Sequence, residues 1–373
     1  MSGEHPPGSA TSGGHRLPGH RHDVRTSGGA VVPGTRVSVE WLDADSILAS
    51  PAAAAGVARE RRGELPYHLL ARRGRTQWWR PLAEIAVFLP LAGIATVVAV
   101  AVTLLLSWAA GSPADLMDAG GSFWPDAPLW SVVMGLGSVA IVLPVVWFTV
   151  RVIARRPFGT VSSVTGALRW RWLLACLPLG LVMAVGNTFL AGALLTAMGE
   201  VDPASAHEGA SSFGSSLWPG WSTFLVFTAV VLVLVPLQAA TEEYVCRGWL
   251  LQTLVTWVGN RWVAAGITSL LFMSLHGRFD LVSVVYFTFF ALLACWVTFR
   301  TGGLEAAIAM HVSANVFYLL IAGTQGIPDM LTEASVPVHL TTVITSVALG
   351  VAYAASVVWL FRRRAMQASG VPA

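Results

Sequence analysis

Long apolar stretches follow one another through this sequence from residue 82 onward. Residues 221–241, for example, contain no charged side chain. About 20 apolar residues are enough for a helix to cross the hydrocarbon core of a bilayer. Over the whole chain, 55% of residues are hydrophobic and 12% are charged, which is more apolar surface than one soluble core can bury. The sequence therefore predicts an all-α polytopic membrane protein.

The apolar stretches predict eight transmembrane helices. Their approximate bounds are 82–108, 130–150, 170–197, 222–240, 262–275, 281–299, 304–322 and 340–361. The fifth is short, and the fourth can extend past two glutamates towards Val258. Residues 1–75, rich in Gly, Pro, Ser, His and Arg, predict a disordered cytoplasmic tail. Residues 76–220 hold the first three spans, 221–364 the other five, and 365–373 a short second cytoplasmic tail.

The basic residues predict how the chain is oriented. All of them are Arg, and they gather before the first span, between the second and third, and after the eighth. The alternate loops around 115–126, 200–208 and 329–333 carry acids and no Arg. The positive-inside rule then places both termini in the cytoplasm, in a multi-pass protein of the plasma membrane. Arg278 is the exception. Juxtamembrane Arg accounts for these charges, so the expected partner is the lipid bilayer and not a nucleic acid.

Ionisable side chains inside the predicted spans gather in the C-terminal half. With one asparagine, the set is Glu242, Glu243, Arg247, His276, His311 and Asn315. Glu243 and Arg247 are four residues apart, so they share a helix face and can pair. At 1.5 Å per residue from the cytoplasmic helix ends, Glu242, His276 and His311 lie roughly 25, 22 and 16 Å into the membrane. The three side chains can therefore meet at one level. Because buried ionisable groups are costly in a membrane, the set predicts a functional site.

A carboxylate with two imidazoles can activate a water molecule, and the residues leave two ways open. Glu or His could bind Zn²⁺ while the remaining Glu serves as general base. Alternatively, Glu242 and a His could form a metal-free acid/base pair, with His311 and Asn315 donating to an oxyanion. Both schemes describe amide hydrolysis.

Two other functions use the same residues. A transporter could use the Glu and His side chains as a proton or ion relay, although the two halves of the chain do not repeat the polar pattern. A non-catalytic immunity or scaffold protein could also keep such a set. The sequence contains no H-E-x-x-H, no G-x-S-x-G and no Walker-type loop.

Three segments in order, EEYVCRG, FMSLH and HVSAN, resemble the motifs of the CPBP intramembrane proteases, the CAAX-protease and bacteriocin-processing (Abi) family. The family pattern is E-E-x-x-x-R, then F-x-x-x-H, then H-x-x-x-N or D. The resemblance covers roughly residues 221–322. It implies that Glu242 is the water-activating base and that Glu243 and Arg247 support the site and order the helix.

The resemblance also implies a possible metal site. His276 would act with Glu242 on water or on a metal, and His311 and Asn315 would complete the metal site or the oxyanion hole. Zinc is the expected metal, although members are described both as metalloproteases and as metal-free glutamate-dependent enzymes. Eukaryotic relatives remove three residues from prenylated CAAX proteins, but this Arg-only, Ala-rich composition is typical of a high-GC bacterium. We therefore expect an intramembrane endopeptidase acting on a membrane-anchored or lipidated protein or peptide.

Overall fold

The computed structural model describes residues 65–74, 77–115, 123–124, 126–199, 218–329 and 339–368. All of them lie within one compact unit, Ala54–Ala373. These residues form helices and isolated bridges but no β-strand, which confirms the predicted all-α class. The predicted disordered tail falls mainly on residues 1–64, outside the described residues.

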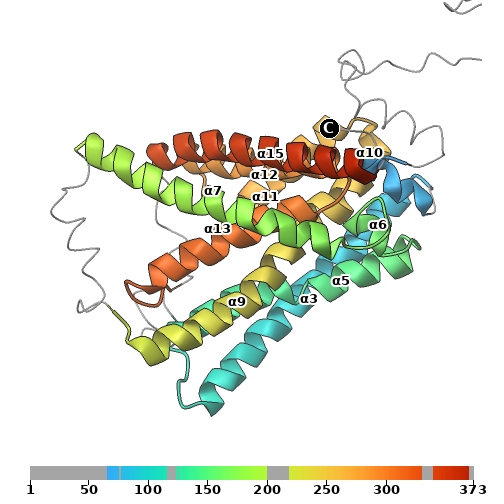
Figure 1. Ribbon diagram of the computed structural model, residues 1–373. Helices are drawn as coiled ribbons and strands as arrows, with labels where there is room; N and C mark the ends of the chain where they lie inside the picture. Colours follow the sequence, from blue (N-terminus) through green and yellow to red (C-terminus); the bar gives the residue numbers. More distant parts are fainter. Residues whose placement is uncertain are drawn as a thin grey trace, which may run out of the picture. The chain divides into compact units, whose positions relative to one another are not determined.

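Seven of the eight predicted spans are long and apolar enough to cross a membrane, so the chain is a multi-pass membrane protein (Figure 1). The fourth span continues past the two glutamates to Val258, as expected. In chain order, the spans are α3 (Arg80–Ala109), α4 with α5 and η2 (Leu129–Ala140, Leu143–Phe148, Thr149–Ile153), α7 (Trp170–Ala197), α9 with η3 and α10 (Trp221–Glu243, Tyr244–Leu250, Leu251–Val258), α12 (Leu281–Thr301), α13 (Glu305–Gly323) and α15 (Leu340–Ala368).

The fifth predicted span is α11 (Arg261–Leu275), and it is shorter than a full crossing. Its 15 residues rise roughly 22 Å, against roughly 30 Å for the hydrocarbon core. Asn260 caps its start by accepting from the backbone N–H groups of Trp262 and Val263. Its end is followed by Gly277, whose φ of +68° lies in the left-handed region that glycine adopts without strain. His276 therefore lies at the turn between α11 and α12.

The predicted disorder of residues 1–75 is wrong at its C-terminal end. The 3₁₀ helix η1 (Tyr67–Arg73) packs into the core, where Tyr67 and Leu70 are buried. The Tyr67 hydroxyl donates to the carbonyl of Val161 at 2.6 Å. Composition missed this helix because two apolar anchors suffice to hold it. The predicted C-terminal tail also begins later, since α15 continues to Ala368.

One loop arginine used for the orientation turns out to be buried. Arg156 precedes the short helix α6 (Gly159–Ser162) and is 1% exposed. Its guanidinium donates to the side chains of Gln252 and Thr160. Burial lowers the pKa of Arg156 to about 10, so the side chain stays charged at neutral pH. Through its bond to Gln252, Arg156 links the loop before α6 to α10.

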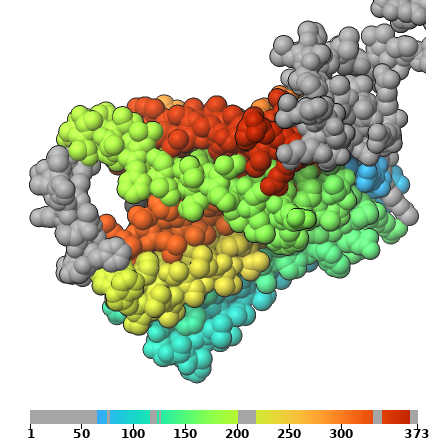
Figure 2. Space-filling view, in the orientation of Figure 1, coloured from blue at the N-terminus to red at the C-terminus, as the bar shows by residue number. Residues whose placement is uncertain are grey.

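Helix α13 occupies the centre of the bundle. It packs against both α7 and α9, while α15 covers the other side of α7 (Figures 1 and 2). The first turn of α13 carries Glu305, which is fully buried and accepts two side-chain bonds from Arg169, at 2.9 and 2.7 Å. The dipole of α13 also favours a carboxylate at this helix start. Helix α13 carries His311 and Asn315, and its packing on both sides fixes the position of these two residues.

Candidate active site

Both glutamates of the first motif lie where the helix changes its hydrogen-bonding pattern. Glu242 and Glu243 end α9, and the π-helical segment η3 begins at Tyr244. Counting back from Val258, Glu242 lies roughly 24 Å from the C-terminal end of a 38-residue span. π-helical turns occur frequently at functional sites because they change which side chains share a face.

Glu243 and Arg247 form a fully buried ion pair. Arg247 Nη1 lies 3.0 Å from Glu243 Oε1, and both side chains have 0% exposure. The guanidinium also lies over the Phe272 ring, 4.2 Å from its centroid. The pairing predicted from the four-residue spacing is confirmed. An ion pair in this setting must be satisfied on both sides, since an unpaired buried charge is strongly destabilising.

Glu243 also binds a histidine on another helix, which the sequence analysis did not predict. Its Oε1 lies 2.9 Å from His311 Nδ1, and His311 is 3% exposed. A carboxylate can only accept, so Nδ1 donates and the lone pair of neutral His311 is on Nε2. Glu243 thus sets the tautomer of His311 and ties α9 to α13.

Glu242 is turned so that its two oxygens have different surroundings. Oε1 accepts a bond from Gln238 Nε2 at 2.7 Å. Oε2 lies 3.5 Å from His311 Nε2 and has no hydrogen-bond partner among the described residues. Two acceptors therefore face each other, and this arrangement requires a shared proton or one donor that bonds to both atoms. The Glu242 side chain keeps 20% exposure, unlike that of Glu243.

His276 lies in an aromatic setting beside this group. Its Nδ1 donates to the carbonyl of Phe272 at 2.8 Å, which leaves the lone pair on Nε2. The His276 ring stacks on Phe287 at 4.1 Å and lies 4.6 Å from the Phe272 ring. Phe272 in turn meets the His311 ring edge-on at 5.9 Å. The second motif thus brings His276 and its Phe to the residues of the first and third.

Asn315 reaches the group through a residue that the sequence analysis missed. Its Nδ2 donates to Gln238 Oε1 at 3.3 Å, and Gln238 donates onward to Glu242. A polar side chain one helical turn before Glu242, at the end of an apolar run, was the available signal. The oxyanion or metal role of Asn315 stays a prediction.

The comparisons with known proteins agree with the motifs. Residues 221–317 match the family of Rce1-like type II CAAX prenyl endopeptidases. This confirms the predicted resemblance and supports a CAAX-protease-type enzyme. The match contains every predicted site residue.

The chain is also similar to a bacterial protein. The uncharacterized protein YyaK of Bacillus subtilis (strain 168) is 27% identical over 202 residues. That alignment covers 51% of this chain and 62% of the Bacillus protein. No solved structure matches the chain.

The Rce1-like segment supplies donor types that suit zinc, but their placement does not form a metal cage. In the part of the chain that the structure describes, no three His, Cys, Asp or Glu side chains are arranged to hold a metal ion. His311 and His276 each donate Nδ1–H to an oxygen, which leaves Nε2 of both rings available as a ligand, whereas the nitrogen of the Asn315 amide faces Gln238. Zinc binding therefore stays a prediction.

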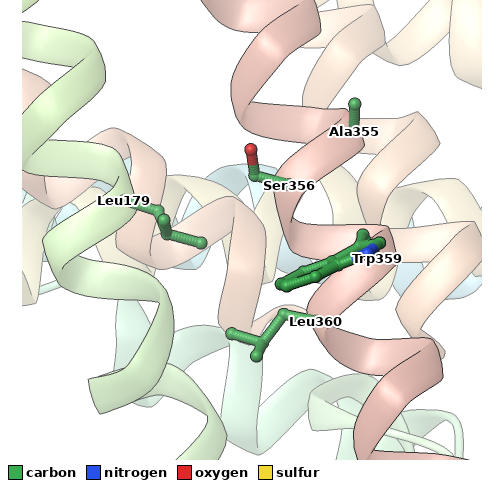
Figure 3. A pocket seen from close by; sticks show the side chains of 5 residues that line it. All are labelled: Leu179, Ala355, Ser356, Trp359 and Leu360. Carbon is green, nitrogen blue, oxygen red and sulfur yellow. The ribbon is translucent and has the colours of Figure 1, made fainter. Parts of the chain in front are cut away.

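A surface pocket lies away from the Rce1-like site. A cavity of about 490 Å³ lies between α7 and α15 (Figure 3). Its lining is mainly apolar and consists of Leu179, Ala355, Ser356, Trp359 and Leu360. None of the predicted site residues lines this pocket, so it is separate from the candidate active site.

Proposed function

We propose that this protein is an intramembrane endopeptidase that hydrolyses a peptide bond in a membrane-associated or lipidated protein. The observation that carries the proposal is the placement of Glu242 Oε2 opposite His311 Nε2, 3.5 Å apart within a membrane span. The remaining atoms of both groups are already held by Gln238 and Glu243. Two fixed acceptors that face each other can together orient a water molecule that donates to both.

In the proposed reaction, a water molecule binds beside the Glu242–His311 pair and donates to Glu242 Oε2 and His311 Nε2. Glu242 takes a proton from it while the oxygen attacks the carbonyl carbon of the substrate. The tetrahedral oxyanion that forms would be stabilised by a hydrogen-bond donor, a role open to the second N–H of the Asn315 amide, whose first N–H is directed at Gln238. The C–N bond then breaks, and the proton held by Glu242 passes to the leaving nitrogen. Glu243 keeps His311 in the required tautomer throughout.

Zinc remains a separate proposal. A bound ion would polarise the substrate carbonyl and make water more acidic. Its ligands would come from Glu242, His276, His311 and Asn315. Mass spectrometry of detergent-purified wild type, beside His276→Ala and His311→Ala, tests this directly. Near-stoichiometric zinc that both variants lose supports a metal site, and active metal-free protein contradicts it.

For cellular location, we propose the plasma membrane with both termini in the cytoplasm. The alternation of Arg-rich and acidic loops supports this orientation. It is consistent with α11 as a short eighth crossing. In this arrangement the Arg261 and Arg300 ends of α11 and α12 face the cytoplasm, and His276 lies deeper in the membrane.

The test compares cleavage of a farnesylated CAAX peptide with that of the same peptide without the prenyl group, using purified protein in nanodiscs. Wild type should cleave the lipidated peptide, and the isosteric Glu242→Gln variant should not. The matched control is Glu84→Gln. Glu84 is also a buried glutamate, but its carboxylate accepts from Trp249 and Thr253, outside the proposed site. Wild-type turnover in Glu242→Gln would contradict the role of Glu242 as the water-activating base. Proton-coupled uptake without any cleavage would favour a transporter.

A further inference from the structure

Gln238 is a buried polar residue that belongs to none of the three motifs. It lies one helical turn before Glu242 on α9 and is 8% exposed. Every other residue from 229 to 240 is Ala, Val, Leu or Pro. We infer that Gln238 is a positioning residue: it holds one oxygen of Glu242 so that the other faces His311, and it links Glu242 to Asn315. This inference rests on the proposed function and deepens it.

The amide of Gln238 is bonded at both ends, so its orientation is determined. Nε2 donates to Glu242 Oε1 at 2.7 Å, while Oε1 accepts from Asn315 Nδ2 at 3.3 Å. If the amide were flipped, its carbonyl oxygen would face the carboxylate and its nitrogen would face another donor. Both contacts would then be unfavourable. The Glu242 carboxylate, which can only accept, thereby fixes which end of Gln238 meets it and which end meets Asn315 of α13.

The bond matters because a carboxylate has two equivalent oxygens on a softly rotating terminal torsion. The short bond from Gln238 occupies Oε1 and has a charged acceptor, which makes it one of the stronger kinds. Oε2 is left opposite His311 Nε2. Without Gln238, no other hydrogen bond from the described part of the chain distinguishes the two oxygens. The base would then sample orientations in which no lone pair points at the water position.

A purely structural role is the competing explanation, because buried amides often bond helices together in membranes. The contact between α9 and α13 does not depend on this amide alone. Phe227, Val231 and Val235 of α9 form an apolar cluster with Leu319 of α13. Gly323 of α13 also lies so close that an added Cβ would come within 2.4 Å of the Phe227 ring. Loss of one amide should therefore disturb chemistry more than folding.

The kinetic test uses two variants with the same expected result. Gln238→Met keeps the shape but removes the donor, and Gln238→Asn keeps the amide but is one methylene too short to reach. For each, kcat should fall by about 10- to 100-fold, as when groups that orient catalytic side chains are removed. KM and the melting temperature should stay near those of wild type. A lower melting temperature with unchanged kcat would mean a structural role and overturn the inference.

Thr241→Val is the matched control on the same helix. Thr241 is 1% exposed and donates to the carbonyls of Leu237 and Ala140, without touching the carboxylates. This variant should keep kcat. If it lowers kcat as much as the Gln238 variants do, the effect comes from general disturbance of α9 and the inference is wrong.

A spectroscopic measurement separates this inference from the proposed function. The infrared carboxylate band of Glu242 is identified by its loss in Glu242→Gln, in protein without substrate. Loss of the bond at Oε1 should shift this band in both Gln238 variants but not in Thr241→Val. An unshifted band overturns the inference even in an active protease. A shifted band in a protein that cleaves nothing supports the placement of Gln238 and refutes the peptidase proposal.

Discussion

Replacing Arg247 by Met removes the guanidinium that faces Glu243 inside the membrane. Both side chains are fully buried, and the charged atoms are 3.0 Å apart. With an effective dielectric constant of about 20, that separation gives an attraction of about 5.5 kcal/mol. Removing the two ions from water costs several kcal/mol each, so the intact pair contributes little net stability. The variant, however, leaves Glu243 with its burial cost and without this attraction.

We therefore expect Arg247→Met to lower the free energy of unfolding by about 3–5 kcal/mol, the usual cost of breaking a buried ion pair. The guanidinium contact over Phe272 is lost as well, which acts in the same direction. The double variant Glu243→Gln/Arg247→Met removes the stranded charge and should recover much of the loss. The assay is reversible unfolding in mixed micelles, followed by circular dichroism.

Arg300→Met is the control, because Arg300 is an exposed cation at the end of α12 beside Trp296. Its removal should change the free energy of unfolding by less than about 1 kcal/mol. The reasoning is refuted if Arg247→Met is within about 1 kcal/mol of wild type, or if the double variant is no more stable than the single one.

Two further substitutions test how α13 is held. Arg169→Met should lower the free energy of unfolding by about 3–5 kcal/mol, because fully buried Glu305 loses the guanidinium that donates to both of its oxygens. Unfolding in micelles measures this loss, and unchanged stability would contradict the prediction. Gly180→Ala should cost about 1–3 kcal/mol and slow any peptidase activity, because the new Cβ would lie 2.8 Å from Ser313 Oγ on α13. Gly192→Ala on the same helix, where a Cβ meets nothing within 4 Å, is its control in thermal unfolding and should be neutral or stabilising.

Features set by neighbouring residues could be predicted from the sequence. Span lengths follow from apolar runs, and seven of the predicted helices have the required length. The pairing of Glu243 with Arg247 follows from four-residue spacing, which places both on one helix face. Glu242 and His311, which the rise per residue allowed to meet, do lie close together.

Features set by packing between helices could not be predicted. Spacing does not show which residue of a neighbouring helix a side chain meets, so the bond from His311 to Glu243 was missed. Gln238 was missed for a related reason: its significance depends on the Asn315 amide across the interface. The π-helical segment from Tyr244 arises from a change in backbone bonding that has no simple sequence signal. Buried Arg156 was misjudged because composition cannot distinguish a loop cation facing water from one bonded to Gln252.

The structure gives a physical reason why two adjacent glutamates differ in their proposed roles. The charge of Glu243 is balanced by Arg247, and its Oε1 also binds His311 Nδ1, so protonating Glu243 would weaken two contacts at once. Glu242 has a neutral amide on one oxygen and no cation paired with it in the described residues unless His311 is protonated. A proton arriving between Glu242 and His311 would therefore relieve an unbalanced negative charge without breaking an ion pair. In the proposed reaction, the paired glutamate therefore supports the site, and the unpaired one exchanges protons with water.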